Sequence, residues 1–238
     1  MSTLRERSHS LVPPFDRNIH DRSIPHLGLI ADGTRRWAEM HGVSLSEAYL
    51  KAVGKIEELS DVVFGQDTRA LSVYLLSVKN LRRDSASLEL IFNAETYMME
   101  FLLPRIAMQW QCKMVHAGDP KLLPKPFALI LRKLCEATSH FRNRVMYLCA
   151  AYDPILEFEH ACNLSKGDGQ SFTSHLWVPN ALDLVVRTGG ERRLSNFLPL
   201  QSGYSEFYFC DKLFPDFTAS DLKDAYTNFH SRQRRHGV

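Results

Sequence analysis

The chain has 238 residues, a formal net charge of +2 and 45% hydrophobic residues. That length buries a core large enough to need no disulfide or structural metal, and so small a net charge argues against a nucleic-acid partner. No apolar run reaches the roughly 20 residues that span a bilayer, so we expect no integral membrane segment. The five cysteines form no C-x-x-C pair, which argues against a zinc cluster and favours a reducing compartment, and we expect a cytoplasmic protein.

Residues 1–24 are polar and contain two prolines, so we expect a mobile N-terminal arm before a single domain over residues 25–238. In that domain, short apolar runs typical of buried parallel strands alternate with helical patterns. The alternation predicts an α/β fold: a mostly parallel, six-stranded twisted sheet flanked by helices. The predicted strands are 27–31, 70–76, 113–117, 145–150, 182–186 and 206–210; the predicted helices are 44–64, a long one from Asp84 or Ser85 past Phe101, one from Asp119–Pro120 to 136, 154–163, and a last one from Thr218–Asp221 into Arg232–Arg235.

The loop after the first predicted strand carries groups that suit a metal and an anion. Ligands of such sheets bind at the carboxyl ends of the strands. Asp32 can hold Mg²⁺, which prefers carboxylate and phosphate oxygens, and Gly33 lets backbone N–H groups approach an anion closely. Taken alone, an Asp-Gly pair is more often a plain turn. The residues that follow, Thr34, Arg35, Arg36 and Trp37, add a hydroxyl and two cations at the same edge.

The loops after the second and fifth predicted strands supply hydroxyl, amide and cationic groups that can hold phosphate oxygens. Glu206 begins the sixth strand, where its carboxylate is a candidate second metal ligand. Three such loops at one edge predict a pocket for a diphosphate and Mg²⁺. The sequence has no G-x-x-x-x-G-K-[ST] or G-x-G-x-x-G motif, which argues against a nucleotide. The loops contain Ser77, Asn80 and Arg83 after the second strand, and Arg187, Arg193 and Ser195 after the fifth.

Four segments resemble the cis-prenyltransferases, the undecaprenyl diphosphate synthase family. They are HLGLIADGTRRWA (26–38), LSVYLLSVKNLRR (71–83), DLVVRTGGERRLSNFLPLQSGYSEFYFCDKLFPDF (183–217) and RRHG (234–237). The resemblance implies the twisted parallel sheet of that family, a homodimer, Mg²⁺ as cofactor and small isoprenoid diphosphates as substrates.

The resemblance also implies roles for individual residues. Asp32 would hold Mg²⁺ and assist departure of an allylic diphosphate, with Glu206 supporting the metal, while Ser77 and Asn80 lie near the reacting carbons. Two sets of residues would then bind the two diphosphates. The allylic set is Gly33, Arg36 and Arg83 with their neighbours Thr34, Arg35 and Trp37; the second set is Arg187, Arg193 and Ser195, with Arg235 and Gly237 reaching across to the second diphosphate of the partner subunit.

Several positions depart from the usual family pattern, which casts doubt on ordinary chain elongation. With G-V-S-L-x-x-x-Y at 42–49, the chain is more similar to a bacterial subgroup, the cyclolavandulyl and isosesquilavandulyl diphosphate synthases. That subgroup makes irregular, lavandulyl-type diphosphates by head-to-middle coupling, so the expected substrates are dimethylallyl diphosphate with dimethylallyl or geranyl diphosphate. The departures are Thr34 and Arg35 for Asn and Gly, Leu45 and Tyr49 for Arg and His, Leu81 for an aromatic residue, Ser87 for Glu, and 151–154 for N-Y-G-G-R.

Three alternatives to this prediction stay open. The first is a regular head-to-tail synthase that uses isopentenyl diphosphate, the second is a non-catalytic partner subunit, and the third is a sugar-phosphate enzyme on the same fold class. The second is disfavoured because Asp32, Arg187 and Arg193 are all present.

Product length would depend on an apolar tunnel between the sheet and the long predicted helix. Bulky side chains there predict a short product of roughly ten to fifteen carbons, judged from the usual volumes of ligand pockets. Any single one of these side chains is more often an ordinary core residue. They are Leu75, Leu76, Phe92, Tyr97, Met98 and Phe101.

Overall fold

A computed structural model describes residues 24–166 and 171–232 of the chain. The predicted N-terminal arm, residues 1–24, therefore lies outside the described residues except for Ile24. Ile24 is 1% exposed and belongs to the hydrophobic core. No helix among the described residues has the length and hydropathy of a segment that spans a bilayer.

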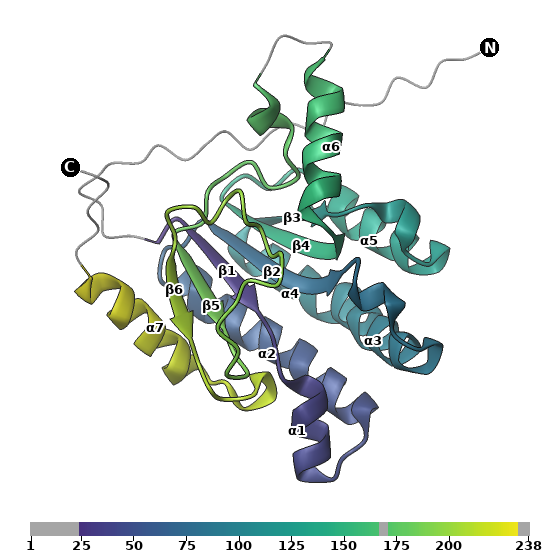
Figure 1. Ribbon diagram of the computed structural model, residues 1–238, viewed down its shortest axis with the longest axis vertical. Helices are drawn as coiled ribbons and strands as arrows, with labels where there is room; N and C mark the ends of the chain where they lie inside the picture. The colour runs from purple at the N-terminus through teal and green to yellow at the C-terminus, as the bar shows by residue number, and fades with distance from the viewer. Residues whose placement is uncertain (1–23, 167–170, 233–238) are drawn as a thin grey trace.

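Six parallel strands form a single twisted sheet in the order β3-β4-β2-β1-β5-β6, which confirms the predicted α/β fold (Figure 1). Nearly every residue of the four central strands is buried, as expected for a sheet covered on both faces. The strands are β1 (His26–Ile30), β2 (Ala70–Ser77), β3 (Cys112–Ala117), β4 (Arg144–Tyr152), β5 (Leu184–Arg187) and β6 (Glu206–Phe209).

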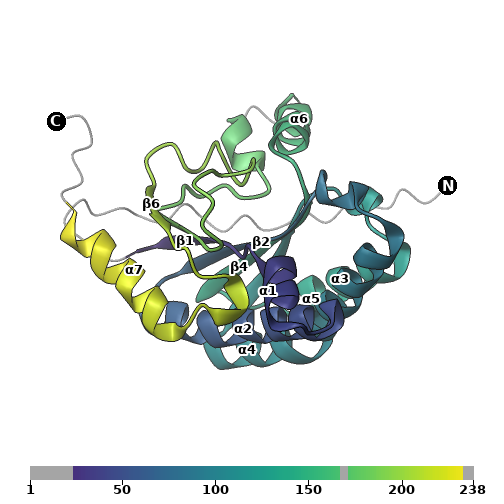
Figure 2. The same ribbon diagram turned by 60° about the horizontal axis from the view of Figure 1, so that its bottom comes forward.

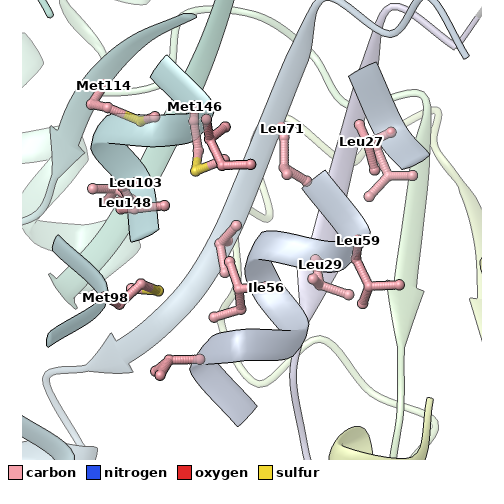
Figure 3. Packing of buried hydrophobic residues seen from close by; sticks show 14 of the residues in the cluster. Leu27, Leu29, Ile56, Leu59, Leu71, Met98, Leu103, Met114, Met146 and Leu148 are labelled. Atoms are coloured by element: carbon pink, nitrogen blue, oxygen red, sulfur yellow. The ribbon is translucent and has the colours of Figure 1, made fainter. Parts of the chain in front are cut away.

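Helices cover one face of the sheet, and irregular chain with one helix covers the other (Figure 2). On the helical side, Ile56 and Leu59 pack against strand residues such as Leu29 and Leu71 (Figure 3). On the opposite side, Val178, Leu182 and Phe197 belong to a second buried cluster. The helices are α1 (Thr34–His41), α2 (Leu45–Gly65), α3 (Ser85–Tyr97), α4 (Leu103–Trp110), α5 (Lys125–Ala137), α6 (Pro154–Ser165) and α7 (Ala219–Ser231).

Three local features differ from the prediction. An unpredicted helix, α1, begins directly after Gly33. The long predicted helix is present but contains a π-helical turn, Met98–Leu102, just before Pro104, which has no N–H to continue the regular ladder. Asp119 caps only a short 3₁₀ turn, and α5 starts afresh after Pro124. Each difference lies at a glycine or proline, where the local backbone overrides side-chain periodicity.

The strand order fixes where the site lies. The chain moves from β1 toward β2 on one side, whereas β5 leads outward to β6 on the other, so the direction of winding reverses between β1 and β5. Ligands of parallel α/β sheets bind at the carboxyl ends of the strands at such a reversal. The register pairs Ile30 with Arg187, so the loops after β1 and β5 leave the sheet side by side.

Candidate active site

A cavity of about 620 Å³ opens at the carboxyl ends of β1, β2 and β5 and extends between α2 and α3. Its mouth is polar and carries Asp32, Arg36, Asn80 and Arg187. Its interior is mostly apolar, because α2 and α3 turn small and branched side chains toward it. Those interior residues include Ala52, Val53, Ile56, Ile91 and Ala94.

Asp32 and Arg187 form an ion pair at the cavity mouth. The Arg187 Nη2 atom donates to Asp32 Oδ2 at 2.8 Å, and Nη1 donates to Ser195 Oγ at 3.0 Å. The Arg187 side chain is only 4% exposed, whereas that of Asp32 is 32% exposed. Arg187 Nε is buried without a hydrogen-bond partner in the described chain. A buried cation with a donor to spare is suited to hold an anion that enters the cavity.

Gly33 and α1 add backbone donors beside this pair. Gly33 has φ +107°, and a Cβ there would come within 2.8 Å of the Leu213 side chain, so only glycine fits. Helix α1 begins directly after this glycine, at the edge of the cavity. The N–H groups of its first turn and its dipole favour an anion there. Arg36, one turn along, donates to the carbonyl of Gly189 at 2.9 Å and lies 3.5 Å from Asp32 Oδ1.

The loops after β1 and β5 are also joined through their backbones. The Thr188 hydroxyl donates to the carbonyl of Asp32 at 2.8 Å and accepts from its N–H at 2.9 Å. Beyond Thr188 the second loop holds Ser195, Asn196 and Leu198 at positive φ, a conformation that is costly for residues with a side chain. This fixed turn sets the Ser195 hydroxyl against Arg187.

Ser77 and Asn80 hold each other at the end of β2. The N–H of Ser77 donates to Asn80 Oδ1 at 3.1 Å, and the N–H of Asn80 donates to Ser77 Oγ at 3.0 Å. Nearby, the Tyr74 hydroxyl donates to the carbonyl of Ser195 at 3.1 Å. These bonds orient polar groups of β2 and the loop after β5 around the cavity.

A carboxyl group of α3 stands in the cavity wall beside Arg83, the residue that links it to the mouth. Glu95 of α3 is 5% exposed, and its Oε2 atom has no hydrogen-bond partner in the described chain. Burial raises the pKa of Glu95 to about 8, although the charge of Arg83 acts in the opposite direction. Burial likewise lowers the pKa of Arg83 and raises that of Tyr49, whose hydroxyl is also unpaired. The three residues form a second polar cluster inside the cavity.

A family model described as "Putative undecaprenyl diphosphate synthase" matches residues 30–237, nearly the whole chain. The chain belongs to the undecaprenyl diphosphate synthase, or cis-prenyltransferase, family. It is a prenyltransferase and an isoprenyl diphosphate synthase. The resemblance seen in the sequence is thereby confirmed at the level of the family.

Curated relatives share about a third of their residues with this family member. An isoprenyl transferase of Corynebacterium efficiens is 33% identical over 89% of the chain and 89% of its own length. A tritrans,polycis-undecaprenyl-diphosphate synthase (geranylgeranyl-diphosphate specific) of Thermoplasma acidophilum is 30% identical, covering 89% of the chain and 88% of its own length. A chloroplastic nerylneryl diphosphate synthase of Solanum lycopersicum is 32% identical, covering 93% and 74%.

Solved cis-prenyltransferase structures have the same fold. Lavandulyl diphosphate synthase from Lavandula x intermedia, in complex with dimethylallyl diphosphate, superposes with a TM-score of 0.85 at 25% identity and covers 91% of this chain and 99% of its own. A probable undecaprenyl diphosphate synthase from Campylobacter jejuni gives a TM-score of 0.78 at 24% identity, covering 91% and 99%.

Twelve residues predicted from the sequence line the cavity. They come from the loop after β1, from β2 and the loop that follows it, and from β5 and its loop, so the three predicted loops do converge. They are Asp32, Gly33, Thr34, Arg35, Arg36, Leu75, Leu76, Ser77, Asn80, Arg83, Arg187 and Ser195.

Two other residues predicted to bind substrate do not line this cavity, and two more cannot be placed. Trp37 is buried between α1 and α2, stacks on His41 and lies beneath Lys51. The Arg193 side chain extends outward to Glu191 at 2.5 Å, and only its carbonyl accepts from Arg187. Arg235 and Gly237 lie outside the described residues.

The expected position of Glu206 needs a correction. Because β6 is parallel to β5 and Glu206 pairs with Leu184, its carboxylate lies at the amino ends of the strands, opposite to Asp32. There it pairs with Arg232 at 2.5 Å. Glu206 and Asp32 therefore do not form one metal site within a single chain.

Four of the six residues predicted for the tunnel face elsewhere. Phe92 packs edge-on against Phe127, Met98 is fully buried in the core, and Tyr97 and Phe101 are largely exposed. The cavity face of α3 is instead formed by Ile91, Ala94 and Glu95. The prediction chose bulky residues as the lining of the tunnel, whereas the open space lies beside positions with small side chains. The missed signal was the spacing: positions i, i+3 and i+4 lie on one helix face, and a lone carboxylate interrupts it.

Asp32 is the residue best suited to hold a metal in this synthase. No group of three His, Cys, Asp or Glu side chains gathers as a metal cluster among residues 24–166 and 171–232. Mg²⁺ does not need one, because it is commonly held by one or two carboxylates together with substrate phosphates and waters. The half-exposed Asp32 carboxylate, among arginines that attract phosphate, fits that kind of site.

Proposed function

We propose that this protein couples dimethylallyl diphosphate to a short allylic diphosphate, dimethylallyl or geranyl, in a head-to-middle manner that gives a branched, lavandulyl-type diphosphate. The observation that carries the proposal is the cavity: its whole volume is only about 620 Å³, and a mouth rich in arginine leads into an apolar interior. The lavandulyl diphosphate synthase of Lavandula, with its 0.85 TM-score, supports the irregular coupling, as do Thr34 and Arg35 in place of the family's Asn and Gly.

The cavity volume favours a short product. The cavity's volume of about 620 Å³ lies within the roughly 300–1,000 Å³ usual for pockets that hold small ligands, and part of it must accommodate the two diphosphates. The interior is also bounded by Ile56, Ile91 and Glu95, and the last of these places a polar group where a long alkyl chain would continue.

The mouth provides two places for a diphosphate. One lies over Gly33 and the first N–H groups of α1, between Arg36 and Arg83, and suits the allylic diphosphate that leaves. The other lies at Arg187 and Ser195 and suits the diphosphate of the second substrate. Because Arg36 and Arg187 are held by hydrogen bonds to the carbonyls of Gly189 and Arg193, they stabilise charge on the leaving diphosphate without rearranging.

Asp32 lies between the two places and would hold Mg²⁺. When bound, the metal supplies additional positive charge for the departing diphosphate. The protein's own residues align the two substrates so that the double bond of the second faces the carbon of the first that loses its diphosphate. Ser77 and Asn80, fixed to each other at the end of β2, border this region.

A homodimer belongs to the same proposal. The sequence resemblance implies that Arg235 and Gly237 reach the second diphosphate of the partner subunit, where Arg235 would add a further cation. Light scattering on the purified protein tests this, and a monomeric enzyme with full activity would contradict it.

Product analysis tests the function. The purified protein is incubated with Mg²⁺ and dimethylallyl diphosphate alone, with geranyl diphosphate added, and with isopentenyl diphosphate added, and the dephosphorylated products are identified by mass spectrometry. We expect branched products without isopentenyl diphosphate. Products that form only when isopentenyl diphosphate is present would establish the head-to-tail reaction instead. Asp32→Ala serves as the inactive control.

A further inference from the structure

Glu95 is an ionisable group in the part of the cavity that would receive hydrocarbon. It projects from α3 on the same face as Ile91 and Ala94, opposite Ala52 and Ile56 of α2. The residue is 5% exposed, and its Oε2 atom has no hydrogen-bond partner among the described residues. A buried carboxyl oxygen without a hydrogen bond destabilises a protein, and such groups concentrate at functional sites.

Of the charged and titratable groups in this cluster, Glu95 is the one best able to accept a proton. Arg83, from the loop after β2, is a cation and accepts no proton. Tyr49, from α2, is a poor acceptor because burial raises its pKa. Glu95 itself has its pKa raised by burial to about 8, so near neutral pH it exchanges a proton readily.

The chemistry of head-to-middle coupling requires a base at this depth. The inner carbon of dimethylallyl diphosphate forms the new bond, which leaves the positive charge on the carbon that bears the two methyl groups. A proton must then leave one of those methyl groups. They are at the end of the substrate remote from its diphosphate, so with the diphosphate at Arg187 they point into the apolar interior, toward α2 and α3.

We propose that Glu95 is the base that removes this methyl proton and ends the coupling reaction, a role that rests on the proposed function. The C–O bond to the first diphosphate breaks with its electron pair on oxygen, and the double bond of the second substrate forms the C–C bond. The methyl C–H bond then breaks, its electrons form the new double bond, and the proton passes to a Glu95 carboxylate oxygen. In head-to-tail coupling the proton leaves a carbon close to the diphosphate, where a base this deep would not serve.

The test compares Glu95→Gln with Glu89→Gln, an exposed glutamate on the same helix. Glu95→Gln keeps the shape of the side chain but not the base. We expect its kcat to fall by about 10²–10⁴-fold, the usual contribution of a general base, with KM changed less than about threefold. Substrate deuterated at its methyl groups should show a larger isotope effect on kcat in this variant. Part of its product should be alcohol, because water captures the longer-lived cation.

The pH dependence gives an independent readout. Wild-type kcat should rise with pH through an apparent pKa near 8 as Glu95 loses its proton, and this limb should vanish in Glu95→Gln while Glu89→Gln keeps it. Equal kcat values and unchanged products in an active wild type and Glu95→Gln would overturn this proposal alone. A wild type inactive with every substrate pair would overturn the proposed function as well.

Discussion

The buried carboxyl of Glu95 should make the stability of the free protein fall as pH rises. Burial raises its pKa to about 8, whereas glutamate in an unfolded chain titrates at about 4.3. Between those two values the folded protein retains a proton that the unfolded chain has released. The free energy of unfolding therefore decreases with rising pH over this window and is largest below it. Glu95→Gln removes the titration and leaves a neutral group of similar size.

The size of the effect follows from the displacement of the pKa. One pKa unit corresponds to about 1.4 kcal/mol. From about pH 5 to about pH 8, wild type should lose about 2 to 4 kcal/mol of stability relative to Glu95→Gln, because the cavity lets water reach the carboxyl and moderates the full effect. For a chain of this length, that is a gap in Tm that widens by roughly 5 to 15 °C.

Urea unfolding or thermal melting of both proteins across this pH range, without substrate, measures the gap. Arg83 and Tyr49, the groups that face Glu95, keep their charge states in this window, so the slope belongs to the carboxyl. Glu89→Gln should follow wild type throughout, because its side chain is exposed. Parallel stability curves for wild type and Glu95→Gln would refute the reasoning, because they would mean that Glu95 is ionised in the folded protein at acidic pH.

Three further predictions concern the mouth and interior of the cavity. Asp32→Ala should lower turnover by about 10³-fold or more, since it removes the carboxylate proposed to hold Mg²⁺, while its circular dichroism spectrum stays that of wild type. EDTA should abolish turnover reversibly. Wild-type rates in either experiment would contradict the proposed metal site. Gly189→Ala should raise KM and cost about 1 to 3 kcal/mol, because φ is +83° and a Cβ would lie 2.7 Å from Arg36 Nη2 and 3.0 Å from the Asp32 carbonyl. Gly190→Ala is its control, with φ +77° but no atom closer than 3.7 Å, so equal KM values for the two would remove the crowding argument. Ala94→Phe should fill the interior and lower kcat/KM for geranyl diphosphate at least about tenfold relative to dimethylallyl diphosphate, the order expected for loss of apolar fit; an unchanged ratio would show that the longer chain lies elsewhere.

The sequence alone predicts the sheet and the mouth of the cavity well, because both depend on strong local signals. Apolar runs mark the buried strands, and the carboxyl ends of parallel strands must share one edge. Asp32 and Arg187 therefore meet although they are 155 residues apart, and their contact at 2.8 Å follows from strand order and register.

The interior is less predictable, because it depends on helix rotation and on which face a helix turns to the sheet. Phe92 and Ala94 are two residues apart on α3, yet one packs against Phe127 and the other lines the cavity. Glu206 was misplaced for a different reason: it begins β6, and in a parallel sheet the start of a strand lies at the edge opposite to Asp32. Its place could be derived from the predicted strand, whereas the rotation of α3 depends on contacts such as that of Phe92 with Phe127, far along the chain.

Arg187 is almost wholly withdrawn from water and already has a negative partner in Asp32. Asp32 thus neutralises the charge of Arg187, and an incoming diphosphate must compete with the Asp32 carboxylate for the guanidinium. The measured affinity of the protein for a diphosphate is then weaker than the attraction between the guanidinium and phosphate alone, because the diphosphate must first displace the Asp32 carboxylate. Drawing the Asp32 carboxylate away to a metal would release Arg187 at the moment the diphosphate arrives, which makes metal and substrate binding mutually reinforcing.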